Sequence, residues 1–181
     1  MIRFLPPDVY DQMPGVSRVR DLYFVAASEP PLNESREVAA LFADLYEAAL
    51  KSQAVSAAIA CEDDTLTAFV YGHPWRWDEQ QDEWSTDLKE RLGSASELLD
   101  GAHALLLLAR DPAVQGAGTG RRVLEAWLAG IGNGSSWLQT ADLMSPARRL
   151  YEMEGFKPIG HGPAAPDGRP GLVMYRGGDS S

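Results

Sequence analysis

The chain has 181 residues and a net charge of −10, a size that suits one domain with a single hydrophobic core. An acidic surface repels nucleic acid, and no apolar run reaches membrane-spanning length, so we expect neither a nucleic acid nor a membrane as partner. The single cysteine, Cys61, cannot form an internal disulfide, and the proline-broken start Met1–Pro7 is unlike a signal peptide. We therefore expect a cytoplasmic protein.

Residues 1–73 predict one strand, two helices and a hairpin. The expected strand is 1–5, the helices are 16–26 and 34–50, and the hairpin strands are 55–61 and 66–71. The second helix has its apolar residues on one face and acids Glu34 and Glu37 in its first turn, with Asn33 as the expected cap.

Residues 74–103 interrupt this pattern and predict a helical insertion. They contain three tryptophans and many acids, and two short helical patterns separate at Gly93, the second opening with the capping pair Ser94 and Glu97. Aromatic faces and carboxylates together can bind a cationic amine acceptor. The alternative is a surface helix whose tryptophans cover the core and whose acids are solvated.

The remainder of the chain alternates strands with helices, which predicts a mixed α/β domain. The expected strands are 105–109, 136–140, 157–160 and 171–176, and the expected helices are 118–131 and 146–154. Residues 1–176 then form a single domain, and 177–181 form a disordered tail.

A glycine-rich turn joins the strand at 105–109 to the next helix. Gly116, Gly118 and Gly120 allow positive φ and close approach of a ligand, and the N–H groups of the new helix point at negative charge. This segment predicts an anion site large enough for a pyrophosphate. Without a ligand, the same residues would form an ordinary strand-to-helix turn.

Three phosphate-binding patterns can be compared with this turn. A P-loop needs a lysine that the turn lacks, and a Gly-x-Gly-x-x-Gly dinucleotide fingerprint needs its third glycine one residue later, although Asp142 lies at a tolerable distance for its acidic partner. The pattern Gln/Arg-x-x-Gly-x-Gly/Ala is satisfied by Gln115, Gly118 and Gly120.

A second motif lies downstream, where Ala147, Tyr151, Gly155 and Phe156 match Asn-x-x-Ala-x-x-x-Tyr-x-x-x-Gly-Phe. The asparagine position holds Met144, so its polar contact is missing or moved to Ser145 or Asp142. With both motifs in order, residues 105–160 resemble the GNAT superfamily of acyl-CoA-dependent N-acyltransferases.

The resemblance implies the GNAT fold, an α/β (α+β) architecture. Its central sheet is mixed, mostly antiparallel and flanked by helices, and its parallel strands, here 105–109 and 136–140, splay apart to admit acetyl-CoA. No metal is implied. The cofactor-binding residues that it implies are Leu107, Leu108, Ala109, Gln115, Gly116, Ala117, Gly118, Thr119, Gly120, Arg121, Asp142 and Tyr151.

Amine acetylation requires two proton movements. A primary amine with a pKa of about 10.4 is protonated at neutral pH, and removing that proton costs about 4.6 kcal/mol. By the motif register, Tyr151 stabilises or protonates the leaving thiolate; its alternative is a core aromatic. His73 is the candidate base, with Asp142 as the other; the alternatives are a loop histidine and a helix-capping aspartate.

These expectations define one function and two alternatives. The resemblance implies an N-acetyltransferase that moves the acetyl group directly from acetyl-CoA to the amine of a small molecule or peptide, and a homodimer is compatible with the sequence. A catalytically inactive acyl-CoA-binding protein or sensor is the first alternative, because the asparagine position departs from the motif and no base is fixed. A dinucleotide-dependent oxidoreductase is the second.

Overall fold

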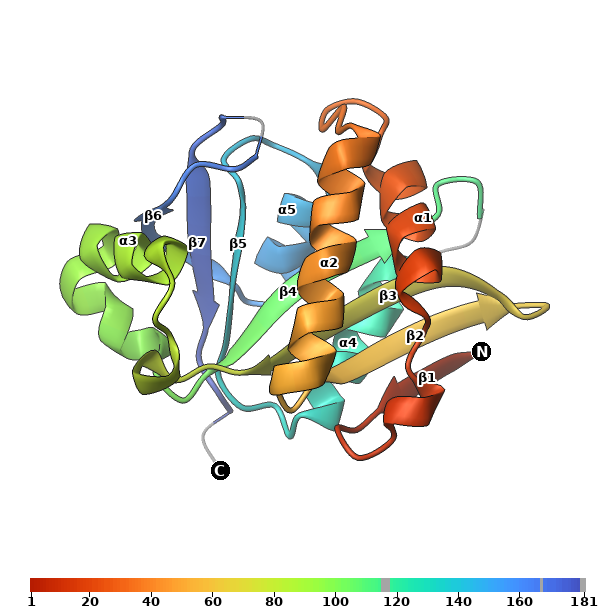
Figure 1. Ribbon diagram of the computed structural model, residues 1–181, viewed down its shortest axis with the longest axis horizontal. Helices are drawn as coiled ribbons and strands as arrows, with labels where there is room; N and C mark the ends of the chain where they lie inside the picture. The colour runs from red at the N-terminus through yellow and green to blue at the C-terminus, as the bar shows by residue number, and fades with distance from the viewer. Residues whose placement is uncertain (115–117, 167, 180–181) are drawn as a thin grey trace. The chain divides into compact units, whose positions relative to one another are not determined.

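The computed structural model describes residues 1–114, 118–166 and 168–179 (Figure 1). The chain forms two compact units: Met1–His73 with Leu107–Gly132 is the first, and Pro74–Leu106 with Asn133–Ser181 is the second. Strand β4, His103–Arg110, contributes residues to both.

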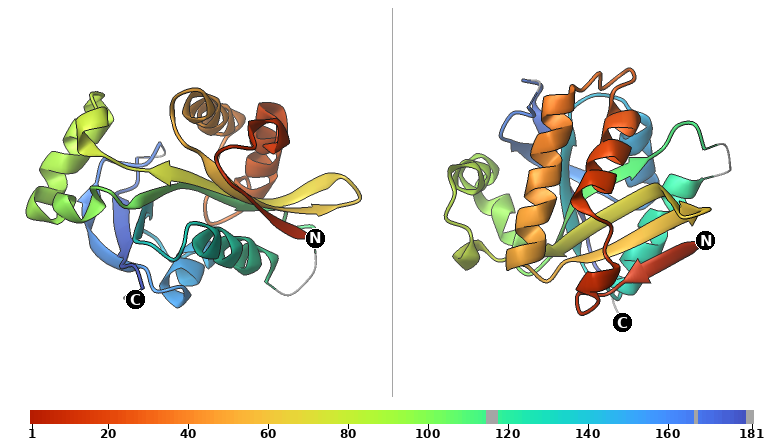
Figure 2. Two further views of the ribbon diagram at one scale, coloured as in Figure 1. Left: turned by 90° about the horizontal axis from the view of Figure 1, so that it is seen from below. Right: turned by 45° about the vertical axis from the view of Figure 1, so that its right-hand side comes forward.

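Unit 1 is built from an antiparallel hairpin, an added edge strand and three helices. Its elements are β1 (Ile2–Leu5), the 3₁₀ helix η1 (Tyr10–Gln12), α1 (Val16–Ala27), α2 (Arg36–Ser52), β2 (Ser56–Glu62), β3 (Thr65–Pro74) and α4 (Thr119–Gly130). Helices α1 and α2 cover one face of the strands and α4 covers the other (Figure 2).

The hairpin of unit 1 follows from its turn residues. Asp63 and Asp64 both have positive φ, as a two-residue turn between twisted antiparallel strands requires. Strand β2 is almost fully buried and is fixed to α4 by the indole of Trp127, whose Nε1–H donates to the carbonyl and hydroxyl oxygens of Ser56 at 3.2 and 3.0 Å. At the end of α4, Gly130 lies so close to the ring of Phe4 that a side chain there would overlap it.

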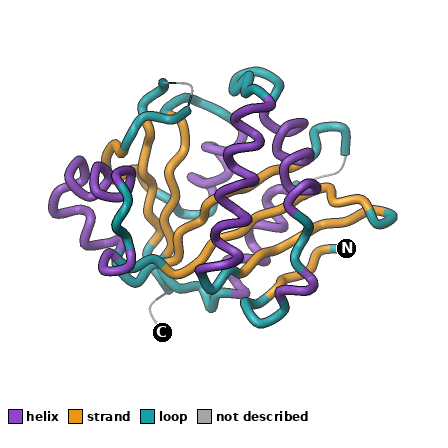
Figure 3. The backbone as a smooth tube through the Cα atoms, in the orientation of Figure 1, coloured by secondary structure: helices purple, strands orange, loops and turns teal. Residues whose placement is uncertain are grey.

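Unit 2 contains the insertion and the C-terminal strands. Its elements are η2 (Trp77–Glu79), α3 (Glu83–Leu92), η3 (Gly93–Leu99), β5 (Ser136–Ala141), α5 (Pro146–Met153), β6 (Lys157–Gly162) and β7 (Gly171–Arg176), coloured by type in Figure 3. Its core is made of the buried side chains of Trp75, Leu88, Leu92, Leu99, Ala102, Ala104, Trp137 and Val173.

The side chain of Gln139 lies between the last two strands of unit 2. Its Nε2 donates to the carbonyl oxygen of Pro163 at 2.9 Å. A side chain at Gly162 would overlap the Gln139 amide, and one at Gly171 would overlap both that amide and the Pro163 carbonyl. These glycines therefore permit the close approach of the three chain segments.

Strand pairing gives a seven-stranded sheet in the order β1-β2-β3-β4-β5-β7-β6. Strands β4 and β5 are parallel and pair at His103↔Ser136 and Ala104↔Trp137, whereas β5, β7 and β6 pair in antiparallel fashion. This confirms the expected mixed, mostly antiparallel sheet with flanking helices.

Two local expectations were wrong. Helix α2 is capped by Ser35, whose Oγ accepts from the N–H of Val38 at 3.3 Å, because Asn33 has φ of 50° and lies in the preceding turn. The second helix of the insertion is the 3₁₀ helix η3; Ser94 lies within it, and no side chain caps it.

The structure describes part of the C-terminal tail, residues 177–179. In the tail expected to be disordered, the N–H of Asp179 donates to the carbonyl oxygen of Asn133 at 3.0 Å, and residues 180–181 lie outside the described residues. Among the described residues, no helix combines the length and apolar character that crossing a membrane demands.

Candidate active site

The first candidate segment runs from β4 into α4, within unit 1. The expected pantetheine-binding residues, Leu107, Leu108 and Ala109, lie in the last half of β4. Asp111 closes the strand: its N–H donates to Thr67 O and its Oδ1 accepts from the N–H of Ala113, both at 2.9 Å. The expected phosphate-binding residues Gln115, Gly116 and Ala117 lie outside the described residues.

Helix α4 begins at a glycine in the left-handed region. Gly118 has φ 75° and ψ 31°, and its carbonyl accepts the N–H of Arg122 at 2.9 Å. Among the described residues, an added Cβ would meet only Arg121 Cβ, at 4.0 Å, and the backbone angle itself favours glycine here. Because Gly118 has no side chain, it offers no side-chain acceptor to the first N–H groups of the helix.

The first turn of α4 also carries two cations and no acid. Thr119 and Gly120 are half-buried there, and Arg121 and Arg122 are exposed. Nε of Arg121 donates to Glu125 Oε1 at 2.9 Å, one turn further along the helix. Cations near a helix N-terminus are disfavoured by the helix dipole unless an anion lies beside them.

The second candidate segment runs from β5 into α5, within unit 2. Here Ser145 is the cap, with Oγ accepting from the N–H of Arg148 at 3.1 Å, and Pro146 starts the helix. The capping alternative for Asp142 was therefore wrong. Met144, at the motif's asparagine position, has 54% of its surface exposed.

Tyr151 lies on the buried face of α5, with 6% of its surface exposed. Gly155 adopts φ of 94° after the helix, which returns the chain so that the N–H of Phe156 donates to Tyr151 O at 3.0 Å and the two rings meet edge to face. Burial raises the pKa of the Tyr151 phenol. Its hydroxyl therefore stays protonated at neutral pH and can donate a hydrogen bond or a proton.

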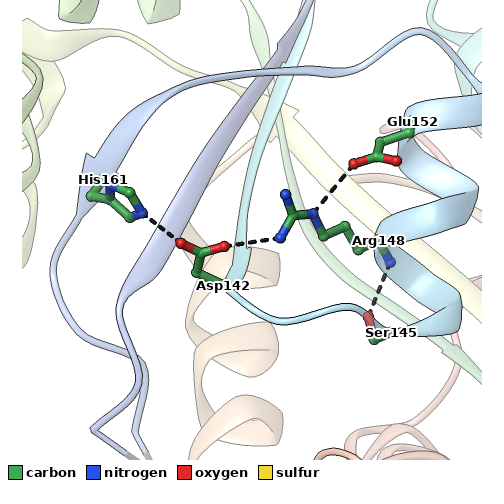
Figure 4. A network of polar contacts seen from close by, with 5 residues as sticks. All are labelled: Asp142, Ser145, Arg148, Glu152 and His161. Atoms are coloured by element: carbon green, nitrogen blue, oxygen red, sulfur yellow. Dashed lines mark hydrogen bonds and ion pairs between the residues drawn. The ribbon is translucent and has the colours of Figure 1, made fainter.

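Asp142, in the β5–α5 connection, bonds to β6 and to α5 through its two carboxylate oxygens (Figure 4). Its Oδ2 lies 2.8 Å from Nε2 of His161 on β6, and its Oδ1 accepts from Nη1 of Arg148 on α5 at 2.9 Å. Nε of Arg148 also lies 3.3 Å from Glu152 Oε1. The hydrogen bond from His161 foremost, and the charge of Arg148, hold the pKa of Asp142 below its ordinary value.

His73, the expected base, lies inside β3 and has 5% of its surface exposed. The strand was expected to end at Tyr71, but it continues to Pro74, so the placement of His73 in a loop was wrong. The extension is explained by pairing, because Gly72 is opposite Ser56 in β2.

Comparison with known proteins decides the fold. No family model matches the chain, and no curated protein matches its sequence. Among solved structures, a protein assigned to the GNAT family of acetyltransferases from Desulfovibrio desulfuricans matches with 17% identity and a TM-score of 0.59, over 97% of this chain and 98% of that one. The chain has the GNAT acetyltransferase fold.

Two further structures of known name support this assignment of the fold. The ribosomal-protein-S18-alanine N-acetyltransferase from Escherichia coli matches with 16% identity and a TM-score of 0.59, over 100% of this chain and 96% of that one. A chain of the NatC complex bound to Gag peptide and CoA matches with 14% identity and a TM-score of 0.58, over 97% and 98%. The GNAT fold expected from the two motifs is thus confirmed.

Within this GNAT fold, two of the three tryptophans of the insertion, Trp75 and Trp77, pack against other residues of unit 2. Trp75 is buried and meets Trp137 edge to face, with ring centroids 5.0 Å apart. Trp77 is half-buried; its Nε1 donates to Ser96 O at 2.9 Å, and Nζ of Lys89 lies 5.5 Å from its ring centroid. Trp84 is exposed. At Trp77, a cationic acceptor would have to displace the ammonium group of Lys89 from the indole ring.

Sequence reasoning missed Arg148 and His161. Arg148 has a local signal, because Glu152 lies four residues later on the same helix face. His161 has none, since its partner Asp142 is 19 residues away in the chain. Only the pairing of β6 with β7, and the loop that returns Asp142 beside them, brings the two side chains together.

Proposed function

We propose that the chain is an acyl-CoA-dependent N-acyltransferase that transfers an acetyl group from acetyl-CoA to a primary amine. The observation that carries the proposal is the start of α4, where a left-handed glycine without a capping side chain precedes a first turn holding Arg121 and Arg122. N–H groups and guanidinium groups in this arrangement suit a pyrophosphate. The GNAT fold supports the assignment, because CoA occupies one structural neighbour.

The chain's own residues divide the binding work. We assign the pyrophosphate to Gly118, Thr119, Gly120 and Arg121, together with Gln115, Gly116 and Ala117. The pantetheine arm is assigned to the backbone of Leu107, Leu108 and Ala109, whose strand N–H and C=O groups can pair with its amides. Acetyl-CoA supplies an acetyl thioester, whose carbonyl carbon accepts the amine lone pair as the C–S bond breaks.

Tyr151 is assigned to the leaving sulfur. A phenol can donate a hydrogen bond to the leaving thiolate. Complete proton transfer to a thiolate with a pKa of about 8.5 costs about 2 kcal/mol for an ordinary phenol, and it costs more for Tyr151 because burial raises its pKa. The raised pKa of Tyr151 keeps the phenol in its donor form, and its place on α5 fixes the ring against Phe156. The proton that the phenol gives up is replaced by the one that the nitrogen loses as the amide forms.

The function can be tested by measuring CoA thiol release with a panel of small-molecule and peptide amines, beside calorimetry of CoA and of nicotinamide cofactors. We expect CoA binding, no nicotinamide binding, and thiol release that depends on one class of amine. CoA binding without thiol release for any amine would instead support an acyl-CoA-binding protein. Binding of a nicotinamide cofactor in place of CoA would support an oxidoreductase.

A further inference from the structure

His161, Asp142 and Arg148 of unit 2 form a hydrogen-bonded chain, in which the imidazole can accept a proton and the carboxylate fixes the orientation of the ring. Its side chains come from β6, the β5–α5 connection and α5, and Asp142 lies between the other two (Figure 4). The exposed fraction of the side chain falls from 54% for His161 to 32% for Asp142 and 19% for Arg148. The charged partners are therefore the more enclosed members, and the imidazole is open to solvent.

The carboxylate determines which ring nitrogen of His161 carries the proton. A carboxylate can only accept, so Nε2 of a neutral imidazole must be the N–H that faces Asp142. Nδ1 then keeps its lone pair. Among the described residues, Nδ1 has no hydrogen-bond partner, so this lone pair is available to a ligand or to water.

Other contacts keep Asp142 charged and in place. Its N–H donates to Pro170 O at 2.9 Å, and Arg148 holds its second oxygen while also reaching Glu152. The hydrogen bond from His161 foremost, and the charge of Arg148, lower the pKa of Asp142, so its carboxylate is ionised near neutral pH.

The neighbours that strand pairing and the packing of α3 identify around His161 are apolar. Opposite it, β7 has Leu172, and α3 meets β6 through Leu88 and Leu92, which side chains added at Gly162 and Gly160 would contact. On α3, Arg91 and Asp87 pair with each other, with Arg91 Nε 2.9 Å from Asp87 Oδ2. In the described part of the chain, Asp142 is thus the charged group bonded to His161, and Arg148 acts on it through Asp142.

We propose that His161 is the base of the transfer reaction, with Asp142 as its positioning residue; this rests on the proposed function. Nδ1 takes one proton from the ammonium group of the acceptor, which frees the nitrogen lone pair for the acyl carbon. The imidazolium formed is stabilised by Asp142 and returns its proton to bulk water through its exposed edge. His73, at 5% exposure, has no comparable access to solvent.

The first test is independent of activity. Nitrogen-15 NMR of the histidine rings, with His161→Gln used to assign the resonance, reports which nitrogen of His161 carries the proton. We expect the Nε2–H form in the wild-type protein and loss of that preference in Asp142→Asn. A wild-type ring protonated on Nδ1 would overturn the proposal, because that nitrogen would then have no lone pair to offer.

The second test measures kcat/KM for thiol release against pH. His161→Ala should lower kcat/KM by about 10²–10⁴-fold near neutral pH. The deficit should shrink toward about pH 10, where the amine loses its proton unaided. Added imidazole should restore part of the rate of His161→Ala. His161→Gln should show the same loss, but imidazole should not rescue it, because the glutamine side chain fills the space that imidazole would occupy. Lys157→Ala, an exposed change on the same strand, should leave the whole profile unchanged.

The outcomes separate the two proposals. If the wild-type protein releases no thiol with any amine, the proposed function fails and the role of His161 fails with it. If the wild-type protein is active but both His161 variants keep its rate and pH profile, only the role of His161 is overturned. A uniform loss at every pH without imidazole rescue would also overturn it, because a purely structural effect does not depend on the protonation of the amine.

Discussion

The two strand-to-helix segments of this GNAT fold begin their helices in opposite ways. Helix α4 follows Gly118, which is left-handed and has no side chain to cap the first turn, whereas α5 follows Ser145, whose Oγ bonds to the N–H of Arg148. The first helix start leaves its N–H groups to a ligand, and the second satisfies one of its own.

Their arginines differ in the same sense. Arg121 pairs with Glu125 within its own helix, and both side chains are about half exposed, whereas Arg148 is more enclosed and also bonds to Asp142 outside its helix. An exposed pair four residues apart contributes little to stability and is easily exchanged for a ligand. This difference agrees with the roles proposed above, in which the start of α4 binds an anion and the β5–α5 segment takes part in proton transfer.

The largest effect is expected from Gly118→Val. A β-branched residue at φ of 75° is strained by about 1–3 kcal/mol, and the turn must shift to relieve it. We expect CoA binding to fall below detection by calorimetry. Gly132→Val is the matched control, because it has φ of 81° at the other end of the same helix and open space around it. Equal CoA affinity in the two variants would refute the anion role of the α4 start.

The next effect is expected from Tyr151→Phe, which keeps the ring and removes the hydroxyl. We expect kcat to fall by about 10²–10⁴-fold with CoA affinity and Tm little changed. Tyr46→Phe is the control, since Tyr46 is also buried but its hydroxyl donates to Pro14 O at 2.7 Å. That variant should lose stability and keep kcat. A fully active Tyr151→Phe enzyme would make Tyr151 a core aromatic only.

A smaller effect is expected from Ser145→Ala. Loss of the cap should lower the free energy of unfolding by about 1 kcal/mol, measured by urea denaturation. Ser35→Ala removes the equivalent cap of α2 and should cost a similar amount. Only Ser145→Ala should also alter the pH profile of kcat/KM, because Arg148 lies on the affected turn and bonds to Asp142. Identical profiles in the two variants would limit Ser145 to capping.

The smallest effect concerns acid stability. The pKa of Asp142 is lowered in the folded chain, and such a carboxyl contributes stability above its unfolded-state pKa and loses it as pH falls through the folded-state value. The Tm difference between the wild-type protein and Asp142→Asn should therefore be full near neutral pH, begin to shrink below about pH 4, and disappear only below the folded-state pKa of Asp142. A difference that persists there would point to packing and not to charge.

Contiguous patterns were enough to predict most of the fold. Apolar periodicity located each helix and strand to within a few residues, and the left-handed Gly118 was foreseen because a strand, a glycine-rich turn and a helix follow one another directly. Prediction failed where a nearby competitor decided the outcome: Asn33 occupies a turn and Ser35 caps instead. It failed again at η3, where tight 3₁₀ bonding replaced the expected helix.

The candidate site was less accessible to sequence reasoning. Tyr151 could be named because its motif spacing is local, although its role stays a prediction. His161 could not, because its partner is fixed by strand pairing and not by spacing along the chain. The exposure of His73 depended on how far β3 extends, which its sequence alone did not reveal.

The packing of Gln139 against two glycines constrains how this chain can diverge. At Gly162 the obstacles are side chains, Gln139 foremost and Leu88 next, so a shorter residue at 139 opens room for an alanine at 162 once the end of the Leu88 side chain also shifts. At Gly171 the obstacle includes the backbone carbonyl of Pro163, which no side-chain replacement removes. Positions 139 and 162 are therefore expected to vary as a pair among relatives, while position 171 stays invariant.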